Sequence, residues 1–442
     1  MVGSCALMCQ LSGEKDSNLK KLSLSNIHLT TLDNKLTVAS DAMVSVDTAS
    51  VGLWIGVGTR HEKLSENGLA HLIEHMLFKG TVKRDAITIA REIENVGGHM
   101  NAYTAREQTA YYAKVLSDDL PLAIELLADI VQNSVFDTSE LDCERSVIVR
   151  EIAQINDTPD DVIFDYFQAA AFPNQTLGRS VLGNVEVVRS IERQSLVNYI
   201  TRMYQAESCV LAVAGLVDHE QLVNIVAKRF NTLPKGTMKE VDFCHYVGGE
   251  IRVERELEQL HIILGFRGTS FFDPDFYTIQ VLSVIYGGGM SSRLFQEVRE
   301  KRGLAYSIYS FTSAYLDDGL FGVYLGTGVK EVVDAIPIVC EQLMLIPDTL
   351  NESELARAKV QIKSSLLMSR ESTSSRSEHL ANHFIIHGKV PNLTKIIDNV
   401  EAVDQSSIRR MVGRLLKNPP TLTSIGFTKT LEDYDKICAR LS

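Results

Sequence analysis

Apolar and polar residues follow two periods along this chain: a period of two predicts strands, and a period near 3.6 predicts helices. In the first half, residues 28–41 are typical of a hairpin that turns at Asp33 and Asn34. Apolar runs bounded by glycine or charge predict strands at 50–60 and 208–217, and two more within 99–116. Helical spacing predicts helices at 66–80, 85–96, 117–134, 137–157, 160–172, 192–204 and 218–230.

The second half repeats this alternation. It begins with a predicted strand at 260–268 and a helix at 277–286, followed by a glycine-rich turn and a helix at 293–301. Predicted strands at 305–313 and 319–328 precede several helices that continue to the end. Two halves of roughly 200 residues that each mix strands and helices predict two domains of an α/β or α+β class, related by duplication.

Breaks in the pattern predict the domain limits. Residues 1–22 are interpreted as a flexible tail, and 23–232 as the first domain. Residues 233–250 have weak periodicity and several helix and strand breakers, which is typical of a linker. Residues 251–442 form the second predicted domain.

Composition narrows the class of protein. The 442 residues carry a formal net charge of −12, which disfavours non-specific nucleic-acid binding. No apolar run reaches the ~18 residues that a membrane-spanning helix needs. Seven scattered cysteines without a CxxC pair favour a reducing compartment. The first residues lack secretory or transit-peptide character, so a bacterial cytoplasm is expected rather than a mitochondrial matrix.

The segment HLIEHMLFKGT carries the clearest candidate chemistry. His71 and His75 are four residues apart, so a helix places both imidazoles on one face, where they can bind one ion. Glu74, beside the second histidine, can act as a general base on a metal-bound water. Two histidines do not complete a catalytic zinc site, so a third ligand must come from elsewhere. His379 and His383 share the spacing without a carboxylate between them, and are interpreted as structural or surface residues.

The motif resembles that of the pitrilysin and insulysin superfamily of zinc metallopeptidases, whose order of histidine and glutamate is the inverzincin pattern. The superfamily's third ligand lies about 76 residues after the second histidine, in a helix with another glutamate seven residues earlier. Glu151 and Glu144 occupy these positions. The resemblance implies that His71, His75 and Glu151 hold zinc, with Glu74 as base. Glu144 would orient a ligand histidine.

The blocks GGHMNAYTAREQTAYYAKVL, LGRSVLG and MSSRLFQEVREKRGLAYSIYS extend the resemblance over nearly the whole chain. They resemble the two-domain branch that includes the mitochondrial processing peptidase β subunit and its bacterial relatives. The branch implies an α+β fold in which two similar domains, each a mainly antiparallel sheet with helices, form half of a clamshell.

Further site residues follow from the same resemblance. Asn101 and Ala102 would bind an extended peptide at a sheet edge. Arg299 and Tyr306 would bind substrate and stabilise the oxyanion from a partner subunit. Asp161 and Asp165 would receive an arginine side chain, predicting a preference for basic peptides. His99 lies near Asn101 but is not assigned to the metal, because the ligand set is already complete.

The sequence thus predicts a zinc endopeptidase that cleaves unfolded peptides as a homodimer, or as a heterodimer with a related subunit. The alternative is a structural or assembly subunit without activity. Relatives of that kind often lose zinc ligands, whereas this chain keeps all three and Glu74.

Overall fold

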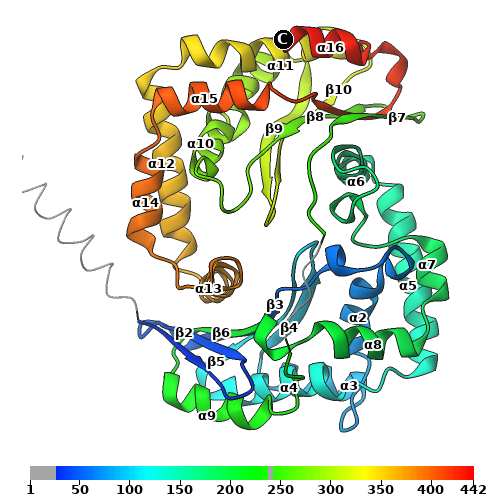
Figure 1. Cartoon of the computed structure of the whole chain (residues 1–442), viewed down its shortest axis with the longest axis vertical. Coiled ribbons are helices and arrows are strands. Elements are labelled where there is room, and N and C mark those ends of the chain that lie inside the picture. The colour runs from blue at the N-terminus through cyan, green and yellow to red at the C-terminus, as the bar shows by residue number, and fades with distance from the viewer. Residues whose placement is uncertain (1–25, 237–241) are drawn as a thin grey trace, which may run out of the picture.

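The computed structural model describes residues 26–236 and 242–442, so the predicted tail and residues 237–241 of the predicted linker lie outside it. Two lobes, each built on one sheet, make up the molecule (Figure 1). The first sheet has the strand order β1-β2-β6-β3-β5-β4, with β1 Ile27–Thr31, β2 Thr37–Ala42, β3 Thr48–Ile55, β4 His99–Thr104, β5 Thr109–Leu116 and β6 Cys209–Gly215. The second has the order β7-β11-β8-β10-β9, with β7 Gly249–Glu254, β8 Leu260–Arg267, β9 Ala305–Ala314, β10 Gly319–Thr327 and β11 Thr421–Gly426.

The two sheets share one topology. Five strands of each sheet correspond, and of these the first and the last in chain order pair in parallel: β2 with β6, and β7 with β11. The other described strand pairs are antiparallel. The first sheet differs only by the additional strand β1 at its edge. The prediction of an α+β chain with two similar, mainly antiparallel domains is therefore confirmed.

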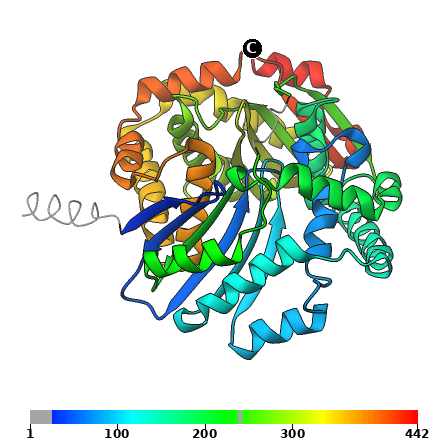
Figure 2. The ribbon, with the colours of Figure 1, turned by 60° about the horizontal axis from the view of Figure 1, so that its bottom comes forward.

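Alternation along the strands sends apolar side chains to both faces of each sheet. On β3, Val51, Leu53 and Ile55 join the main core of the first lobe, whereas Trp54 faces the other side and joins a smaller cluster. Figure 2 shows helices of the first lobe lying across one face of its sheet. The helices of this lobe are α2 Leu69–Leu77, α3 Ala86–Asn95, α4 Leu120–Asn133, α5 Thr138–Asn156, α7 Val185–Ser190, α8 Arg193–Met203 and α9 His219–Arg229.

The second lobe is built in the same way around its own apolar core. Its helices are α10 Phe276–Gly287, α11 Val332–Thr349, α12 Glu352–Ser369, α14 Leu393–Glu401, α15 Gln405–Leu415 and α16 Tyr434–Arg440. A π-helical turn, η6 (Phe295–Glu300), precedes β9. Across residues 26–236 and 242–442, no helix combines the length and apolarity needed to cross a bilayer.

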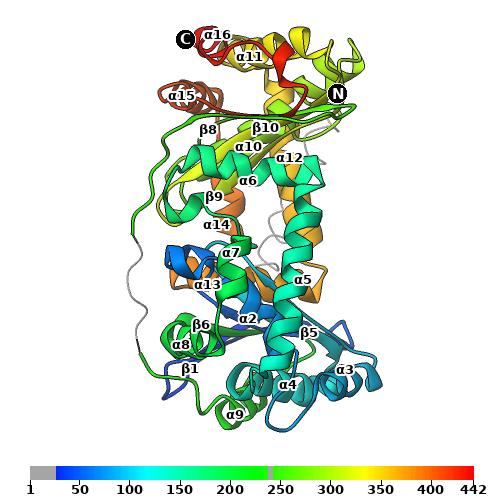
Figure 3. The same cartoon turned by 90° about the vertical axis from the view of Figure 1, so that its right-hand side faces the viewer.

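The lobes exchange one helix each. Helix α6 (Pro159–Ala171) follows α5 in the chain but packs on β8 and β11 of the second sheet, where Ile163 and Phe167 are buried. Helix α13 (Thr373–His387) follows α12 but packs on β3 and β6 of the first sheet. Figure 3 shows α5 running lengthwise from the first lobe to the second, where α6 begins. The exchange ties the two sheets together.

Polar contacts fix the exchanged helix α13 on the first sheet. Arg376 makes a bidentate ion pair with the buried Asp41 of β2, with the Nε to Oδ2 distance at 2.7 Å. The Ser50 hydroxyl lies 2.9 Å from that of Thr373. A buried carboxylate without a partner is costly, so these contacts specify one docking position as well as adding stability.

Three local predictions need correction. The strand predicted at 50–60 ends at Ile55, because the chain turns into a short 3-10 helix at Thr59–His61. Strand β7 begins at Gly249, within the range predicted as linker. Strand β11 was missed: it is a short, fully buried strand among helices, and a buried run lacks the alternation that marks a half-exposed strand.

Candidate metal centre

Helix α2 presents the histidine motif next to the core of the first lobe. Leu69, Leu72, Ile73 and Met76 are buried in that core and fix the rotation of the helix. His71 is buried on the adjoining face, and Glu74 and His75 are half-buried. Because α5 packs against α2, residues of both helices meet there.

His71, His75 and Glu151 form one cluster. Their ligand atoms all lie within 4.8 Å of one another, and they are the one such group of three among residues 26–236 and 242–442. Glu151 Oε2 lies 3.9 Å from His71 Nε2 and 3.7 Å from His75 Nε2. The structure therefore brings together the three residues that the motif and the 76-residue interval predicted.

This donor set fits a zinc ion. Two imidazole nitrogens and one carboxylate oxygen are a typical catalytic zinc set, which leaves one position for water. Donors about 2.0–2.1 Å from a tetrahedral ion lie about 3.3 Å apart, so the two separations that Glu151 makes, 3.9 and 3.7 Å, would need to shorten by roughly half an ångström when the ion binds. Glu151 is the most exposed of the three, with 36% of its side chain accessible, against 11% for His71 and 18% for His75.

Glu144 holds the ring of His75. Its Oε2 lies 2.9 Å from His75 Nδ1, and its Oε1 lies 2.7 Å from Lys79 Nζ. When Nδ1–H donates to a carboxylate, Nε2 keeps its lone pair for a metal. The geometry agrees with the predicted orienting role of Glu144. Lys79 belongs to the same set of contacts and was not singled out from the sequence.

Glu74 has the surroundings of a proton acceptor. Its Oε2 is enclosed and has no hydrogen-bond partner among the residues that the structure describes. Burial raises the pKa of Glu74, an effect that nearby Thr104 and His75 reduce and Glu151 increases. A carboxylate with a raised pKa accepts a proton more strongly than an ordinary one, as general-base catalysis requires.

A buried carboxylate holds the start of α2, and sequence reasoning missed it. Glu62 accepts hydrogen bonds from the backbone N–H of Ala70 at 2.7 Å, from that of Gly68 at 3.0 Å, and from Asn67 Nδ2 at 3.1 Å. Burial raises its pKa to about 7. An acidic residue just before a predicted helix was the available signal, but it does not show which backbone amides the carboxylate caps.

The block LGRSVLG packs against the same helix start. Gly68, with φ of 101°, and Gly183 approach so closely that a Cβ on Gly183 would lie 2.4 Å from Gly68 Cα. Arg179 Nη1 donates to the Glu62 carbonyl at 2.8 Å. The block therefore positions helix α2 rather than adding a residue to the candidate ligand cluster.

Among the strands that the structure describes, β4 pairs with β5 alone, which leaves β4 at a free edge of the first sheet. Asn101 is exposed and Ala102 is buried, as alternation requires. The N–H of Ala102 donates to Asn101 Oδ1 at 2.8 Å. An extended peptide could pair with this edge, which keeps Asn101 and Ala102 as the predicted contacts.

Arg299 and Tyr306 lie in the second lobe, away from the metal cluster of the first. The Arg299 guanidinium stacks 5.4 Å from the centre of the Tyr306 ring and 4.7 Å from that of Phe295. Tyr306 is 74% exposed, and no ion pair engages Arg299 within the described ranges. Arg299 lies in a π-helical turn, a feature frequent at functional sites. The two side chains that the resemblance implied as a pair therefore contact each other.

Asp161 and Asp165 differ in their surroundings. Asp165 accepts a hydrogen bond from the Ser180 hydroxyl at 2.6 Å and pairs with Arg106 at 3.3 Å. Asp161 is exposed. It lies near Tyr309 of β9, whose pKa is raised by the burial of Tyr309 and by the negative charges of Asp160 and Asp161. Within residues 26–236 and 242–442 no ion pair engages the Asp161 side chain, whereas Asp165 already has partners.

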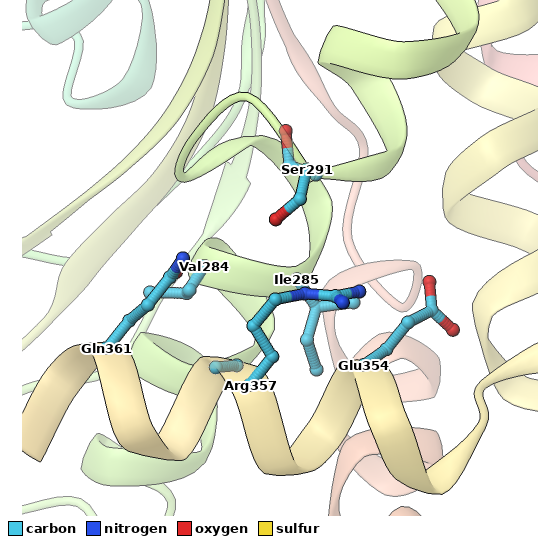
Figure 4. Close-up of a pocket in the computed structure, with 8 residues that line it drawn as sticks. Val284, Ile285, Ser291, Glu354, Arg357 and Gln361 are labelled. Atoms are coloured by element: carbon cyan, nitrogen blue, oxygen red, sulfur yellow. The ribbon is translucent and has the colours of Figure 1, made fainter.

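The glycine-rich turn leads to a small pocket rather than to a phosphate site. Figure 4 shows Ser291, Arg357 and Gln361 around this pocket between α10 and α12. Its volume is about 10 Å³, close to the space that one water occupies. The pocket is therefore too small for a substrate.

Comparisons with known proteins show the family to which the chain is similar. Residues 37–185 match the insulinase family, peptidase family M16, and residues 190–362 match the peptidase M16 inactive domain. An uncharacterized zinc protease of Rickettsia felis is 39% identical over 383 residues, which cover 86% of this chain and 93% of that protein. The mitochondrial-processing peptidase subunit beta of Homo sapiens is 36% identical over 430 residues, with 94% and 88% covered.

Solved structures share the fold. A protease from Helicobacter pylori superposes with a TM-score of 0.85 at 21% identity, covering 91% of this chain and all of that one. A chain of complex III2 from Candida albicans gives the same TM-score at 22% identity, with 94% of this chain covered. Identities this low indicate a common fold and nothing about activity.

Proposed function

The chain belongs to the insulinase family, peptidase family M16, and from that premise we propose that it is a zinc-dependent endopeptidase that cleaves unfolded peptides. One observation carries the proposal: Glu151 of α5 reaches the imidazoles of His71 and His75 on α2, with all ligand atoms within 4.8 Å. These residues would hold zinc. When bound, the ion would polarise the scissile carbonyl and lower the pKa of water toward ~7.

The residues of the chain would carry the remaining chemistry. Glu74 Oε2 would take a proton from the attacking water and return it to the leaving amine. Glu144 would keep the His75 Nδ1 proton in place, so that Nε2 faces the cluster. The free edge of β4 would align an extended peptide by backbone hydrogen bonds, which suits substrates without a fixed sequence.

The exposed carboxylate of Asp161 supports a preference for basic peptides. Because Asp165 is already paired, we assign the substrate cation to Asp161. Asp161→Asn should raise KM for an arginine-containing peptide with little change for a neutral one. Asp165→Asn is the comparison variant and should affect thermal stability more than KM, because it breaks the contacts to Ser180 and Arg106.

Glu74→Gln tests the activity itself. The amide cannot accept the proton, so kcat on a fluorogenic peptide should fall by about 10²–10⁴-fold while zinc content stays unchanged. Equal activity in both proteins would remove Glu74 from its role. Inactive wild-type protein that carries full zinc would favour the alternative, a non-catalytic assembly subunit, to which the match of residues 190–362 to an inactive domain also points.

The cellular compartment and the oligomeric state are part of the proposal. Similarity to the Rickettsia protease supports a bacterial cytoplasm, and similarity to the mitochondrial subunit keeps a mitochondrial matrix as the alternative. We propose a homodimer, or a heterodimer with a related subunit, because Arg299 and Tyr306 lie in the other lobe from the cluster. Light scattering on purified protein measures the assembly.

A further inference from the structure

Helix α13 carries a ladder of three histidines, His379, His383 and His387, at successive intervals of four residues. None of them belongs to the proposed peptidase site. The rings of His379 and His383 are 6.0 Å apart, but those of His383 and His387 are only 4.6 Å apart. The rings of the proposed zinc ligands His71 and His75 are 4.7 Å apart. The second pair of the ladder therefore has the spacing of the metal pair.

The end of α13 fixes the tautomer of His383. Gly388 takes the left-handed conformation with φ of 65° and ends the helix, so the chain turns back. This turn brings the carbonyl of Lys389 to 2.9 Å from His383 Nδ1. A carbonyl only accepts, so Nδ1 carries the proton and Nε2 keeps its lone pair. The same arrangement of imidazole and backbone carbonyl orients histidine ligands at metal sites.

Both histidines are half-buried, and the His387 ring packs edge-on against that of Phe272 at 5.4 Å. His383 and His387 line a cavity of about 830 Å³ between α13, α14 and the start of α10. Asp273 and Asp275 line it too, but they pair with Arg414 and Arg410. No third imidazole, thiolate or carboxylate joins the pair in a tight cluster within the described part of the chain. The remaining ligands of an ion bound there would come from water or from the amide oxygens of Asn392 and Asn399, which line the same cavity.

We propose that His383 and His387 form a second binding site for a divalent transition-metal ion, open to the cavity and separate from the peptidase centre. Two neutral imidazoles favour Cu²⁺, Ni²⁺ and Zn²⁺ over Mg²⁺ and Ca²⁺, which prefer oxygen ligands. Affinity should follow the order in which Cu²⁺ binds most tightly. With two protein ligands, the ion should exchange readily and be lost on dialysis against a chelator before the ion at the three-ligand cluster.

The test is metal stoichiometry on untagged, full-length protein after equilibrium dialysis against Cu²⁺ or Ni²⁺. The wild-type chain should bind two equivalents of the metal ion per chain. The His387→Asn variant should bind one equivalent. His379→Asn, on the same helix but outside the close pair, should bind two. His75→Asn should lose the other equivalent, so failure of the peptidase centre and failure of this site give different results.

Two further measurements keep the test decisive. His383→Asn should reproduce the loss, and unfolding curves of each variant identify any that does not fold. The His75→Asn variant, which lacks one imidazole of the peptidase centre but keeps His383 and His387, should give with Cu²⁺ an electron paramagnetic resonance spectrum with coupling to two nitrogens. The proposal would be wrong if the wild-type chain bound only one equivalent of metal. It would also be wrong if His383→Asn and His387→Asn each still bound two equivalents.

Discussion

Lys79 Nζ lies 2.7 Å from Glu144 Oε1, and the other oxygen of this carboxylate lies 2.9 Å from His75 Nδ1. Lys79 and His75 are four residues apart on the same helical face, although Lys79 lies just beyond the last turn of α2. Burial opposes the charge of Glu144, but hydrogen bonds from Lys79 and His75 hold its pKa below the ordinary value. A lysine outside the motif therefore stabilises the carboxylate that orients a proposed ligand.

Lys79→Met should lower zinc affinity by about 3–10-fold, and Glu144→Gln by about 10–100-fold, the range found for partners of ligand histidines. Lys79→Arg should keep most of the affinity, because it keeps the charge. Competition with a chromophoric chelator measures the zinc affinity of each variant. The exposed Lys83 offers a control, since Lys83→Met should have no effect. Equal affinities for Lys79→Met and wild type would show that Lys79 does not act on the site.

Mixing two inactive variants tests whether the dimer shares its site. If Arg299 acts on the partner's metal centre, Glu74→Gln and Arg299→Ala protomers together rebuild one complete site in each mixed dimer. Random mixing at equal amounts should then restore about a quarter of wild-type activity, because half of the dimers are mixed and each has one of two sites. Activity no greater than the sum of the separate variants would place Arg299 on the centre of its own chain.

Gly68→Ala should destabilise the protein by about 2–4 kcal/mol, from left-handed strain and from crowding against Val188 and the Leu182 carbonyl. Urea unfolding measures the change. Gly413→Ala on α15 is the matched control, because a Cβ there meets nothing within 4 Å. It should stabilise the helix by about 0.5–1 kcal/mol. A small effect of Gly68→Ala would mean that this helix start tolerates a Cβ.

Glu62 should make stability depend on pH. Its pKa is about 7 when folded, against an ordinary value of 4.5, so between these values the folded state binds more proton than the unfolded state. Stability from this group is therefore present below pH 4.5 and is lost as pH rises toward 7, by at most about 1.4 kcal/mol per pH unit.

Glu62→Gln should remove this slope. Unfolding free energies of both proteins at several values between pH 4.5 and 8 measure it, and the difference between them should change through that window and then level off. Parallel curves would show that Glu62 is ionised throughout, with its charge held by the amides at the start of α2.

Local patterning determined much of this protein. The period of 3.6 placed His71, Glu74 and His75 on one buried helix, because side chains four apart share a face whatever the rest of the fold does. The interval from His75 to Glu151 indicated the third ligand only through resemblance to a family. The two halves were predicted because strands and helices alternate in each of them, although the sequence pattern did not reveal β11.

Tertiary structure decided what depends on contacts between distant segments. No local period shows that α6 and α13 exchange lobes, that Glu62 caps α2, or that Asp165 is already paired while Asp161 is exposed. It also does not show that His387 rather than His379 lies close to His383, since both are four residues away. Rotamers, turns and packing partners make those choices, and they are fixed by the burial of surfaces that lie far apart in the sequence.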